Sequence, residues 1–234
     1  MRKHIFPALL GLLAALTLNA AEKPTVDSIL ERYVKEAGGR EAVEKVKTLE
    51  FEGEFKMGDL AAPMRSARKE PNKTAWKIDF DGATYAQGFD GKHGWKQDPN
   101  GIQSLDSREL RTLKRNGALR PEIDFKEIYP NLQYKGTETR RGEEVHILES
   151  KAAPVTSRLA FSAKSGLLVG STVTDGDYQS VSYLGNYKKT DGVMRPHTSE
   201  EKIEGPDGSL DFVLELKKVT TNGELKDDRF AEPR

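Results

Sequence analysis

Apolar and polar residues alternate along many short segments of this chain, and the clearest case lies between residues 49 and 57. There Phe51 and Phe55 fall on one side of the pattern, and Glu52 and Glu54 fall on the other. A period of two is typical of a strand, whose successive side chains point to opposite faces of a sheet. We therefore predict an antiparallel strand with one buried and one solvated face. The predicted buried face consists of Leu49, Phe51, Gly53, Phe55 and Met57.

Alternating runs of the same kind fill most of the remaining chain, and polar turn sequences such as Asp191-Gly192 separate them. Pro63 and Pro71 are expected at the ends of strands, because proline cannot donate a ladder hydrogen bond. The further predicted strands are Met64–Lys69, Thr74–Phe80, Thr84–Phe89, a run from Leu132, Val155–Phe161, Leu167–Thr174, Tyr178–Lys189, Val193–Ile203 and a last long strand around 210–217.

The stretch Phe89–Trp95 predicts a β-hairpin in the first half of the chain. Asp90-Gly91 is typical of a type I′ turn, in which both central residues need a positive φ. Before the turn, residues 85, 87 and 89 should share one face of the strand. Three aromatic residues gather around this hairpin, either as core side chains or as ligand contacts: Trp76, Phe89 and Trp95.

Two helices are predicted near the N-terminus. From Thr25 to Ala37, apolar residues recur at helical spacing, which predicts a helix with one stripe packed on the core. Thr25 is a suitable N-cap, and Gly38-Gly39 should end the helix. A shorter helical turn is expected at about Arg40–Val46.

A third helix, Asp106–Asn116, should interrupt the strands. Asp106 and Glu109 form a capping box, and Leu110 and Leu113 lie one turn apart, so they should face inward. We interpret this helix as a lid that hinges at Asn100-Gly101 and at residue 117; the alternative is that it simply plugs the sheet. Residues 119–130 should form a loop or short helix over the sheet. The basic face of the lid is either solvated or an anion site, and it carries Arg108, Arg111, Lys114 and Arg115.

The number of elements limits the possible folds, because about a dozen strands each have one apolar face and only two or three helices can cover them. Twist accumulates in a wide sheet, so a flat arrangement is not expected. The sequence predicts a mainly β protein, with a strongly curved, incomplete antiparallel β-barrel and its helices in the concavity. Such a body either fills its interior or leaves an apolar cavity.

The first twenty residues have the pattern of a secretory signal peptide rather than a membrane anchor. Arg2-Lys3-His4 is a charged start, Ile5–Leu18 is apolar, and small residues follow. The apolar run is shorter than the roughly 20 residues that span a bilayer. We expect cleavage after Ala20 or Ala21, and a single domain from residue 21 to residue 234.

Composition narrows the class of protein further. The chain has 234 residues, 37 basic and 37 acidic, and no cysteine. Loss of Arg2 and Lys3 would leave a net charge of about −2, so no basic field suggests nucleic acid as a partner. Without cysteine, an exported chain holds together by packing alone, and it lacks the residue that would carry a lipid anchor. We therefore expect a free, soluble periplasmic protein.

Catalytic chemistry is hard to find in the sequence. His93, His146 and His197 have no partner at metal-ligand spacing and are expected on the surface. The acidic segments 79–82 and 175–177 do not complete a calcium loop and are expected to be turns. There is no G-x-S-x-G sequence and no thiol. We predict no cofactor, no metal and no enzymatic activity.

Several segments together resemble a known family. They are Gly38-Gly39, Phe89-Asp90-Gly91-Lys92-x-Gly94-Trp95, Tyr187-x-x-x-Asp191-Gly192-Val193-x-x-Pro196 and Val219-x-x-Asn222-x-x-Leu225-x-Asp227-x-x-Phe230-x-x-Pro233. In these segments the chain resembles the outer-membrane lipoprotein-sorting-protein-like family, which is related to the carrier LolA and the receptor LolB. The resemblance implies a half-barrel in which helices form a lid over an apolar cavity for acyl chains.

The leading hypothesis is a periplasmic carrier for lipid or the acyl chains of lipoproteins. It is expected to be a monomer that makes transient contact with membrane proteins. The alternatives are a non-catalytic exported scaffold with a filled core, and a hydrolase with an unrecognised site. The residues predicted to line an apolar cavity are Trp76, Phe89, Trp95, Leu110 and Leu113.

Overall fold

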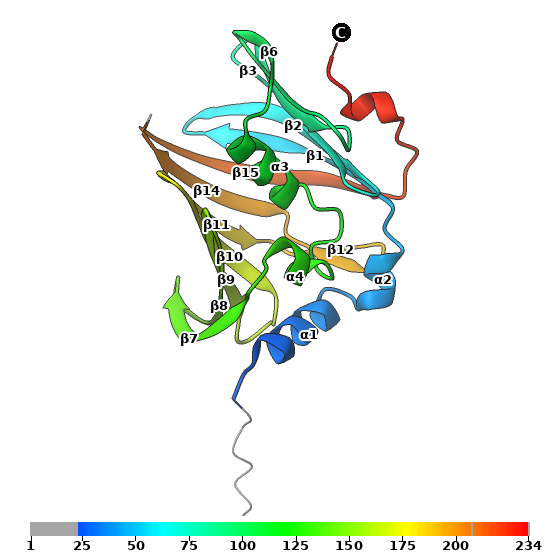
Figure 1. Cartoon of the computed structure of the whole chain (residues 1–234). Coiled ribbons are helices and arrows are strands. Elements are labelled where there is room, and N and C mark those ends of the chain that lie inside the picture. Colours follow the sequence, from blue (N-terminus) through cyan, green and yellow to red (C-terminus); the bar gives the residue numbers. More distant parts are fainter. Residues whose placement is uncertain (1–22, 207, 234) are drawn as a thin grey trace, which may run out of the picture.

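The computed structural model describes residues 23–206 and 208–233, and its main feature is a strongly curved antiparallel sheet (Figure 1). Thirteen strands form this sheet in the order β6-β5-β4-β3-β2-β1-β15-β14-β11-β10-β9-β8-β7. Strands β1 and β15 pair at its centre, and two meanders run from there to the edges β6 and β7. The two edges do not pair with each other, so the barrel is incomplete, as predicted.

The strands of this sheet are β1 (Thr48–Met57), β2 (Leu60–Lys69), β3 (Lys73–Phe80), β4 (Ala83–Phe89), β5 (Gly94–Asp98), β6 (Gly101–Ser104), β7 (Gln133–Arg140), β8 (Glu143–Ala152), β9 (Val155–Ser162), β10 (Leu168–Asp175), β11 (Tyr178–Gly185), β14 (Thr198–Gly205) and β15 (Gly208–Thr221). A separate hairpin consists of β12 (Lys188–Thr190) and β13 (Val193–Arg195). The strand predicted at 178–189 is therefore two strands, because Asn186, with a φ of 50°, ends β11.

The helices are α1 (Val26–Glu36), α2 (Arg40–Glu44), α3 (Ser107–Asn116), α4 (Phe125–Ile128) and the 3₁₀ helix η1 (Asp227–Phe230). Helices α1 to α4 lie on the concave side of the sheet, which we call the inner face (Figure 1). The predicted caps are confirmed: the side chain of Thr25 caps α1, and Asp106 and Glu109 form the capping box of α3. Each cap satisfies N–H groups that the first helical turn leaves without a partner.

The register of the strands assigns each side chain to one face. Phe89 pairs with Gly94, and a Cβ at Gly94 would lie within 3.0 Å of Leu105 and Leu110 beside α3, so this face is the inner one. Trp95 is the next residue along β5 and lies on the outer face, where its indole Nε1 donates to the Phe230 carbonyl at 2.9 Å. Alternation thus separates the two aromatic residues that the sequence analysis grouped together.

One end of the inner face is filled by a closed apolar core. The rings of Tyr33, Phe125 and Phe161 meet there edge to face or tilted, at centroid distances of 5.3 to 5.7 Å. Such ring pairs stabilise a core beyond the area that they bury. We call this region the closed end; its buried residues are Ile29, Leu30, Tyr33, Ala37, Phe125, Leu148, Leu159, Phe161 and Leu167.

The predicted two-residue turn at Asp90-Gly91 is wrong, although the hairpin itself is confirmed. Four residues connect β4 to β5, and of the two predicted turn residues only Gly91 has a positive φ. The Asp90 carboxylate accepts the backbone N–H groups of Lys92 and His93, each at 2.7 Å. This side-chain turn replaces the backbone turn that the sequence suggested, because aspartate bonds the main chain two and three residues ahead.

Three further expectations need correction. Pro63 lies inside β2 opposite Glu54, just beyond the last pair between β2 and β3, where no partner strand needs its missing N–H. His197 is buried rather than exposed, and its Nδ1 lies 3.1 Å from the Arg195 carbonyl oxygen. Phe51 is buried as predicted, because it packs with Val43 and Val46, whereas Phe55 is only half-buried.

The C-terminal segment packs on the outer face of β2 and β3. Phe230 is fully buried there, in a cluster with Leu225, Ala67 and Ala75. Among the described residues, no helix is long and apolar enough to cross a membrane. The predicted signal peptide lies in residues 1–22, which are outside the described part of the chain.

Candidate ligand-binding surface of the inner face

The inner face away from the closed end carries a row of half-buried aromatic side chains. Phe55 of β1 lies between Phe80 of β3 and Phe212 of β15, with ring centroids at 5.7 Å and 5.1 Å. All three rings are half-buried. Strand β2 lies between β1 and β3 and contributes only the small, buried side chain of Ala62 opposite Phe55. We call this row, together with the half-buried Ile78 and Ile203, the aromatic strip.

The rim of the aromatic strip is more exposed than any other large apolar surface of the described chain. Four large apolar residues of the described chain are exposed, and the strand register places three of them on the inner face. Their exposed fractions are 55% for Leu60, 40% for Leu210 and 38% for Tyr85. Apolar side chains that gather on one face of a protein usually mark a place where something binds.

Helix α3 crosses this part of the inner face and is fixed at one side by apolar contacts. Leu105 and Leu110 enclose Gly94, and Leu113 is buried. Glu109 adds an ion pair with Lys96 of β5, at 2.7 Å. At the C-terminal end of the helix, a Cβ on Gly117 would collide with Thr74 at 2.4 Å, so this residue has to be glycine.

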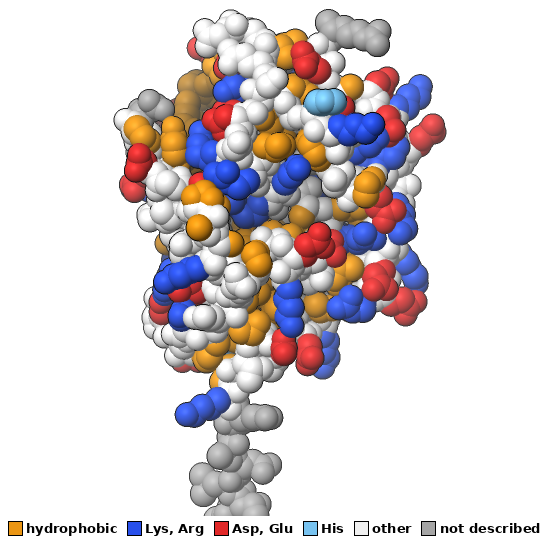
Figure 2. Space-filling model, viewed as in Figure 1, with side chains coloured by type: hydrophobic (Ala, Val, Ile, Leu, Met, Phe, Trp, Pro, Cys, Tyr) orange, Lys and Arg blue, Asp and Glu red, His pale blue; other side chains and the backbone are white. Residues whose placement is uncertain are grey.

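The other side of α3 reaches strands β10 and β11 through long basic side chains. Arg111 makes a bidentate ion pair with Asp175, with nitrogen–oxygen distances of 2.9 to 3.2 Å. The Arg108 guanidinium stacks over the Tyr178 ring at 3.8 Å from its centroid. Basic side chains gather at this place on the surface, over α3 (Figure 2). The helix therefore bridges the two sides of the concavity.

A buried polar group lies between α3 and the closed end. Arg195 of β13 pairs with Glu122 at 3.0 Å, and both side chains are about 95% buried. Burial raises the pKa of Glu122, and the nearby Arg195 opposes that shift. Burial also lowers the pKa of Arg68 to about 10. One partner of such a pair is costly to remove, because the other is left as an uncompensated buried charge.

The five side chains predicted to line a cavity do not form one group. Phe89 and Leu113 are buried between β4 and α3, and the half-buried Leu110 lies beside them. Trp76 shares the inner face with Phe89 by register. Trp95 lies on the outer face and cannot share a cavity with them.

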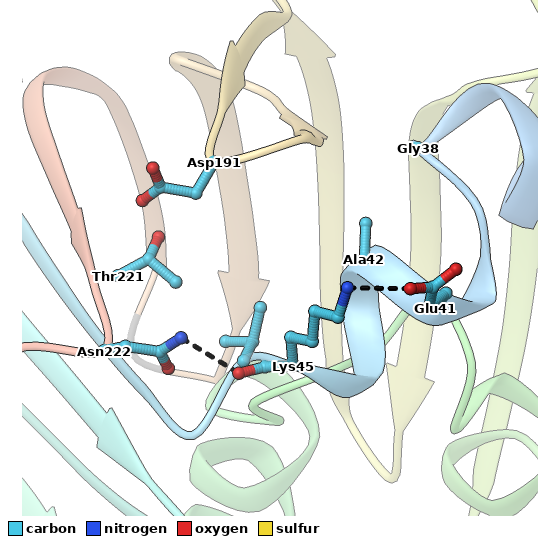
Figure 3. Close-up of a pocket in the computed structure, with 8 residues that line it drawn as sticks. Gly38, Glu41, Ala42, Lys45, Asp191, Thr221 and Asn222 are labelled. Carbon is cyan, nitrogen blue, oxygen red and sulfur yellow. Dashed lines mark hydrogen bonds and ion pairs between the residues drawn. The ribbon is translucent and has the colours of Figure 1, made fainter.

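Two hollows of the described part of the chain lie away from the aromatic strip. The first, of about 290 Å³, lies beside α2, where the Glu41–Lys45 ion pair and the Asn222 amide close its wall (Figure 3). Gly38 has a φ of 119° and leaves no room for a Cβ beside the Gly192 carbonyl. Three segments on which the family resemblance rests meet in this corner and contact one another there.

The second hollow, of about 810 Å³, lies on the outer face between the sheet and the C-terminal segment. Ala67, Ala75, Ala86 and Trp95 contribute apolar lining, and the charged lining residues are of both signs: Arg65, Lys77, Arg229, Asp228 and Glu232. Asp227 ties the segment down through Lys69 and Lys73, at 2.8 and 2.7 Å. The two lysines that donate to its carboxylate lower the pKa of Asp227 to about 2.

The three histidines of the described chain differ in their exposure. His93 is exposed, and the half-buried His146 lies 3.3 Å from the Tyr134 hydroxyl. Within residues 23–206 and 208–233, no group of three histidine, aspartate or glutamate side chains is placed to hold a metal ion. Glu201 has its pKa raised by burial on the inner face, where Ser182 and Ser199 donate to it.

Sequence reasoning found the basic face of α3 and the alternation of β1, but it did not single out the aromatic strip. Phe55, Phe80 and Phe212 each belong to a strand with a simple alternating pattern, which predicts burial equally well at every apolar position. Only the position of α3 over the folded sheet reveals which of these residues remain partly exposed. The signal was their clustering near hairpin ends, far from any predicted helix.

Comparison with family models gives no match, and no curated protein matches the chain. Solved structures do match it over most of its length. A LolA superfamily protein from Nitrosomonas europaea aligns with a TM-score of 0.58 at 16% identity, over 90% of this chain and 99% of that one. A domain from Vibrio parahaemolyticus that is described as an outer membrane lipoprotein-sorting protein aligns with a TM-score of 0.56 at 15% identity, over 86% and 97%.

A DUF1329 family protein from Desulfovibrio piger aligns similarly, with a TM-score of 0.56 at 14% identity, over 88% of this chain and 97% of that one. At these identities the comparisons show the fold. They confirm the half-barrel fold that the sequence motifs indicate, and they do not transfer a ligand to this chain.

Proposed function

We propose that this protein is an exported, non-catalytic carrier that binds the acyl chain of a lipid or lipoprotein along the aromatic strip. The observation that carries the proposal is the strip itself: three half-buried phenylalanine rings in a row, on the concave face and beside a bridging helix. Burial of such side chains against an acyl chain would be favourable by about 25 cal/mol per Å² of apolar surface. The LolA-like fold and the described lipoprotein-sorting neighbour agree with this class of ligand.

The proposed export and the function are tested together on protein recovered from a periplasmic extract. Intact-mass measurement should give a chain that starts at Ala21 or Glu22, because the small residues there follow an apolar segment. Native mass spectrometry of the same sample should show a bound lipid. A membrane-retained chain of full length would contradict the export.

Binding itself is tested with the neutral fluorescent probe N-phenylnaphthylamine and its displacement by monododecanoylglycerol. Phe212→Ser should weaken binding of both molecules, because it removes a ring from the strip. Val213→Ser is the matched control, since Val213 is half-buried on the same strand and faces the other side of the sheet. If neither molecule binds the native protein, or if both variants weaken binding equally, the strip is not the site.

The bridging helix should respond to the ligand if it acts as a lid. Hydrogen exchange of residues 100–130 should slow when monododecanoylglycerol is bound, because a lid belongs to the less stable parts of a fold. Exchange in β8 and β9, which form the closed end, should stay unchanged. Unchanged protection over α3 would mean that the helix is a fixed plug.

A further inference from the structure

Three arginines of α3 form a single surface that the carrier function leaves unexplained. Arg108, Arg111 and Arg115 are spaced by three and four residues, which places them on one face of a helix. This face points toward β10 and β11, as the contacts with Asp175 and Tyr178 show. We call these three side chains the arginine face.

The arginine face carries more positive charge than its surroundings neutralise. Asp175 pairs with Arg111 and has only 8% of its side chain exposed. Among the described residues, neither Arg108 nor Arg115 has a carboxylate within ion-pair distance. The acidic residues of α3 are used elsewhere, since Asp106 caps the helix and Glu109 binds Lys96.

Arg115 is bound only weakly within the described part of the chain. Its one hydrogen bond joins Nη2 to the Thr112 hydroxyl at 3.4 Å, and its Nε is buried without any acceptor. Loss of hydration lowers the pKa of this guanidinium. A buried donor without a partner is destabilising, and more so when it is charged, so an acceptor at this place would be stabilising.

The arginine face borders the aromatic strip. Tyr178, which carries the Arg108 guanidinium, lies flat against Gly205, where a Cβ would come within 2.5 Å of the ring. On the same two strands Ser180 pairs with Ile203, which belongs to the strip. An extended chain lying on the strip would thus end beside the Arg108 guanidinium, at the edge of the arginine face.

From this arrangement we propose that the protein selects amphiphiles with an anionic head, carboxylate or phosphate, which Arg108 and Arg115 bind while the chain lies on the aromatic strip. This inference rests on the proposed carrier function and names its class of ligand. The planar guanidinium suits both head groups, because it presents parallel N–H donors to paired oxygens. Asp175 holds Arg111 in place and leaves the other two groups for the ligand.

The test compares amphiphiles with the same chain and different heads. Dodecanoate, dodecyl phosphate and neutral monododecanoylglycerol are each titrated against bound N-phenylnaphthylamine at pH 8. The anionic molecules should bind at least about tenfold more tightly, since charge-assisted hydrogen bonds contribute more than 1.4 kcal/mol. Their affinity should fall with added salt, whereas that of the neutral molecule should not. The carboxylate and phosphate titrations show which head is preferred.

The paired variant Arg108→Gln with Arg115→Gln should abolish the preference and leave the affinity for monododecanoylglycerol unchanged. Arg141→Gln is a matched control, because Arg141 also stacks on a tyrosine, Tyr183, at 3.7 Å and pairs with Glu200, but on the outer face. Equal affinity for the neutral and anionic molecules, or a preference that survives the paired variant, would overturn the inference and leave the carrier function standing. Failure of every amphiphile to bind would overturn both.

Discussion

The closed end and the aromatic strip belong to one inner face, yet they differ in what covers them. At the closed end, α1 and α4 bring Tyr33 and Phe125 onto Phe161, and all three side chains are buried. Beside the strip, α3 uses its apolar side for β4 and turns arginines toward β10 and β11. The sheet thus forms a packed core at one end and a half-open apolar surface at the other. The difference arises because α1 and α4 turn aromatic side chains toward the sheet, whereas α3 turns arginines toward β10 and β11.

The largest effect that this comparison predicts is a difference in stability between two phenylalanine substitutions, one at each end of the inner face. Phe161→Ala should lower the free energy of unfolding by about 3–5 kcal/mol, because it leaves a cavity among buried rings. Phe212→Ala should lower it by about 1–2 kcal/mol, because the ring is only half-buried. Urea unfolding measures both values. Similar losses would show that the strip is as tightly packed as the closed end.

Strand β1 allows the same contrast within one element. Phe51 is buried against α2 by Val43 and Val46, so Phe51→Ala should cost about 3–5 kcal/mol. Phe55→Ala should cost less than half as much, because Phe55 is part of the strip. Glu52→Ala should be nearly silent in thermal unfolding, since its ion pair with Lys218 is exposed. A large effect at Glu52 would contradict the assignment of faces.

The fold was accessible from sequence because its determinants are local. Alternation in β1, the cap of α1 at Thr25 and the box at Asp106 and Glu109 each involve residues within a few positions of one another. Local rules failed where a side chain changed the connection, as at Asp90, whose carboxylate lengthens the hairpin loop to four residues. With a loop of either two or four residues, the alternation of side chains places Phe89 and Trp95 on opposite faces of the sheet.

The site was less accessible because it depends on contacts between distant residues. The sequence indicated the basic face of α3, but its position depends on Asp175, which is 64 residues away from Arg111. The buried pair of Arg195 and Glu122 spans 73 residues and carries no local pattern. The Trp95 indole is held by Phe230 in a tail whose place on the outer face no periodicity predicts.

The link between α3 and β10 gives a smaller and more local prediction. Asp175→Asn should lower the free energy of unfolding by about 1–2 kcal/mol, because a partly buried charge-assisted pair is lost. Hydrogen exchange should accelerate in α3 and remain unchanged in β8 and β9 of the closed end. Glu200→Gln, which removes the exposed pair with Arg141, serves as a control and should have little effect. Uniform acceleration over both ends would mean that α3 is part of the global core.

The smallest expected effect concerns the outer side of β2 and β3, behind the half-open part of the inner face. There the Asp227 carboxylate binds Lys69 and Lys73, which lower its pKa to about 2 in the folded protein. A carboxyl group whose pKa is depressed on folding stabilises the folded state above its unfolded pKa of about 3.9, and this contribution disappears as the pH falls toward 2.

Between pH 4 and pH 2, the Asp227→Asn variant should therefore lose less stability than the native protein does. At pH 7 the variant should be slightly less stable than the native protein. Because the carboxylate is fully exposed, the effect should be small and should shrink further in high salt. Acid titration of the thermal midpoint measures it, while hydrogen exchange locates it: protection should fall first in residues 225–231 and in β3, with the closed end unaffected. An identical acid profile for the native protein and Asp227→Asn would mean that the buried Phe230 ring and the hydrogen bonds to the Phe230 and Leu225 carbonyls, rather than the Asp227 ion pairs, fasten the C-terminal segment to the sheet.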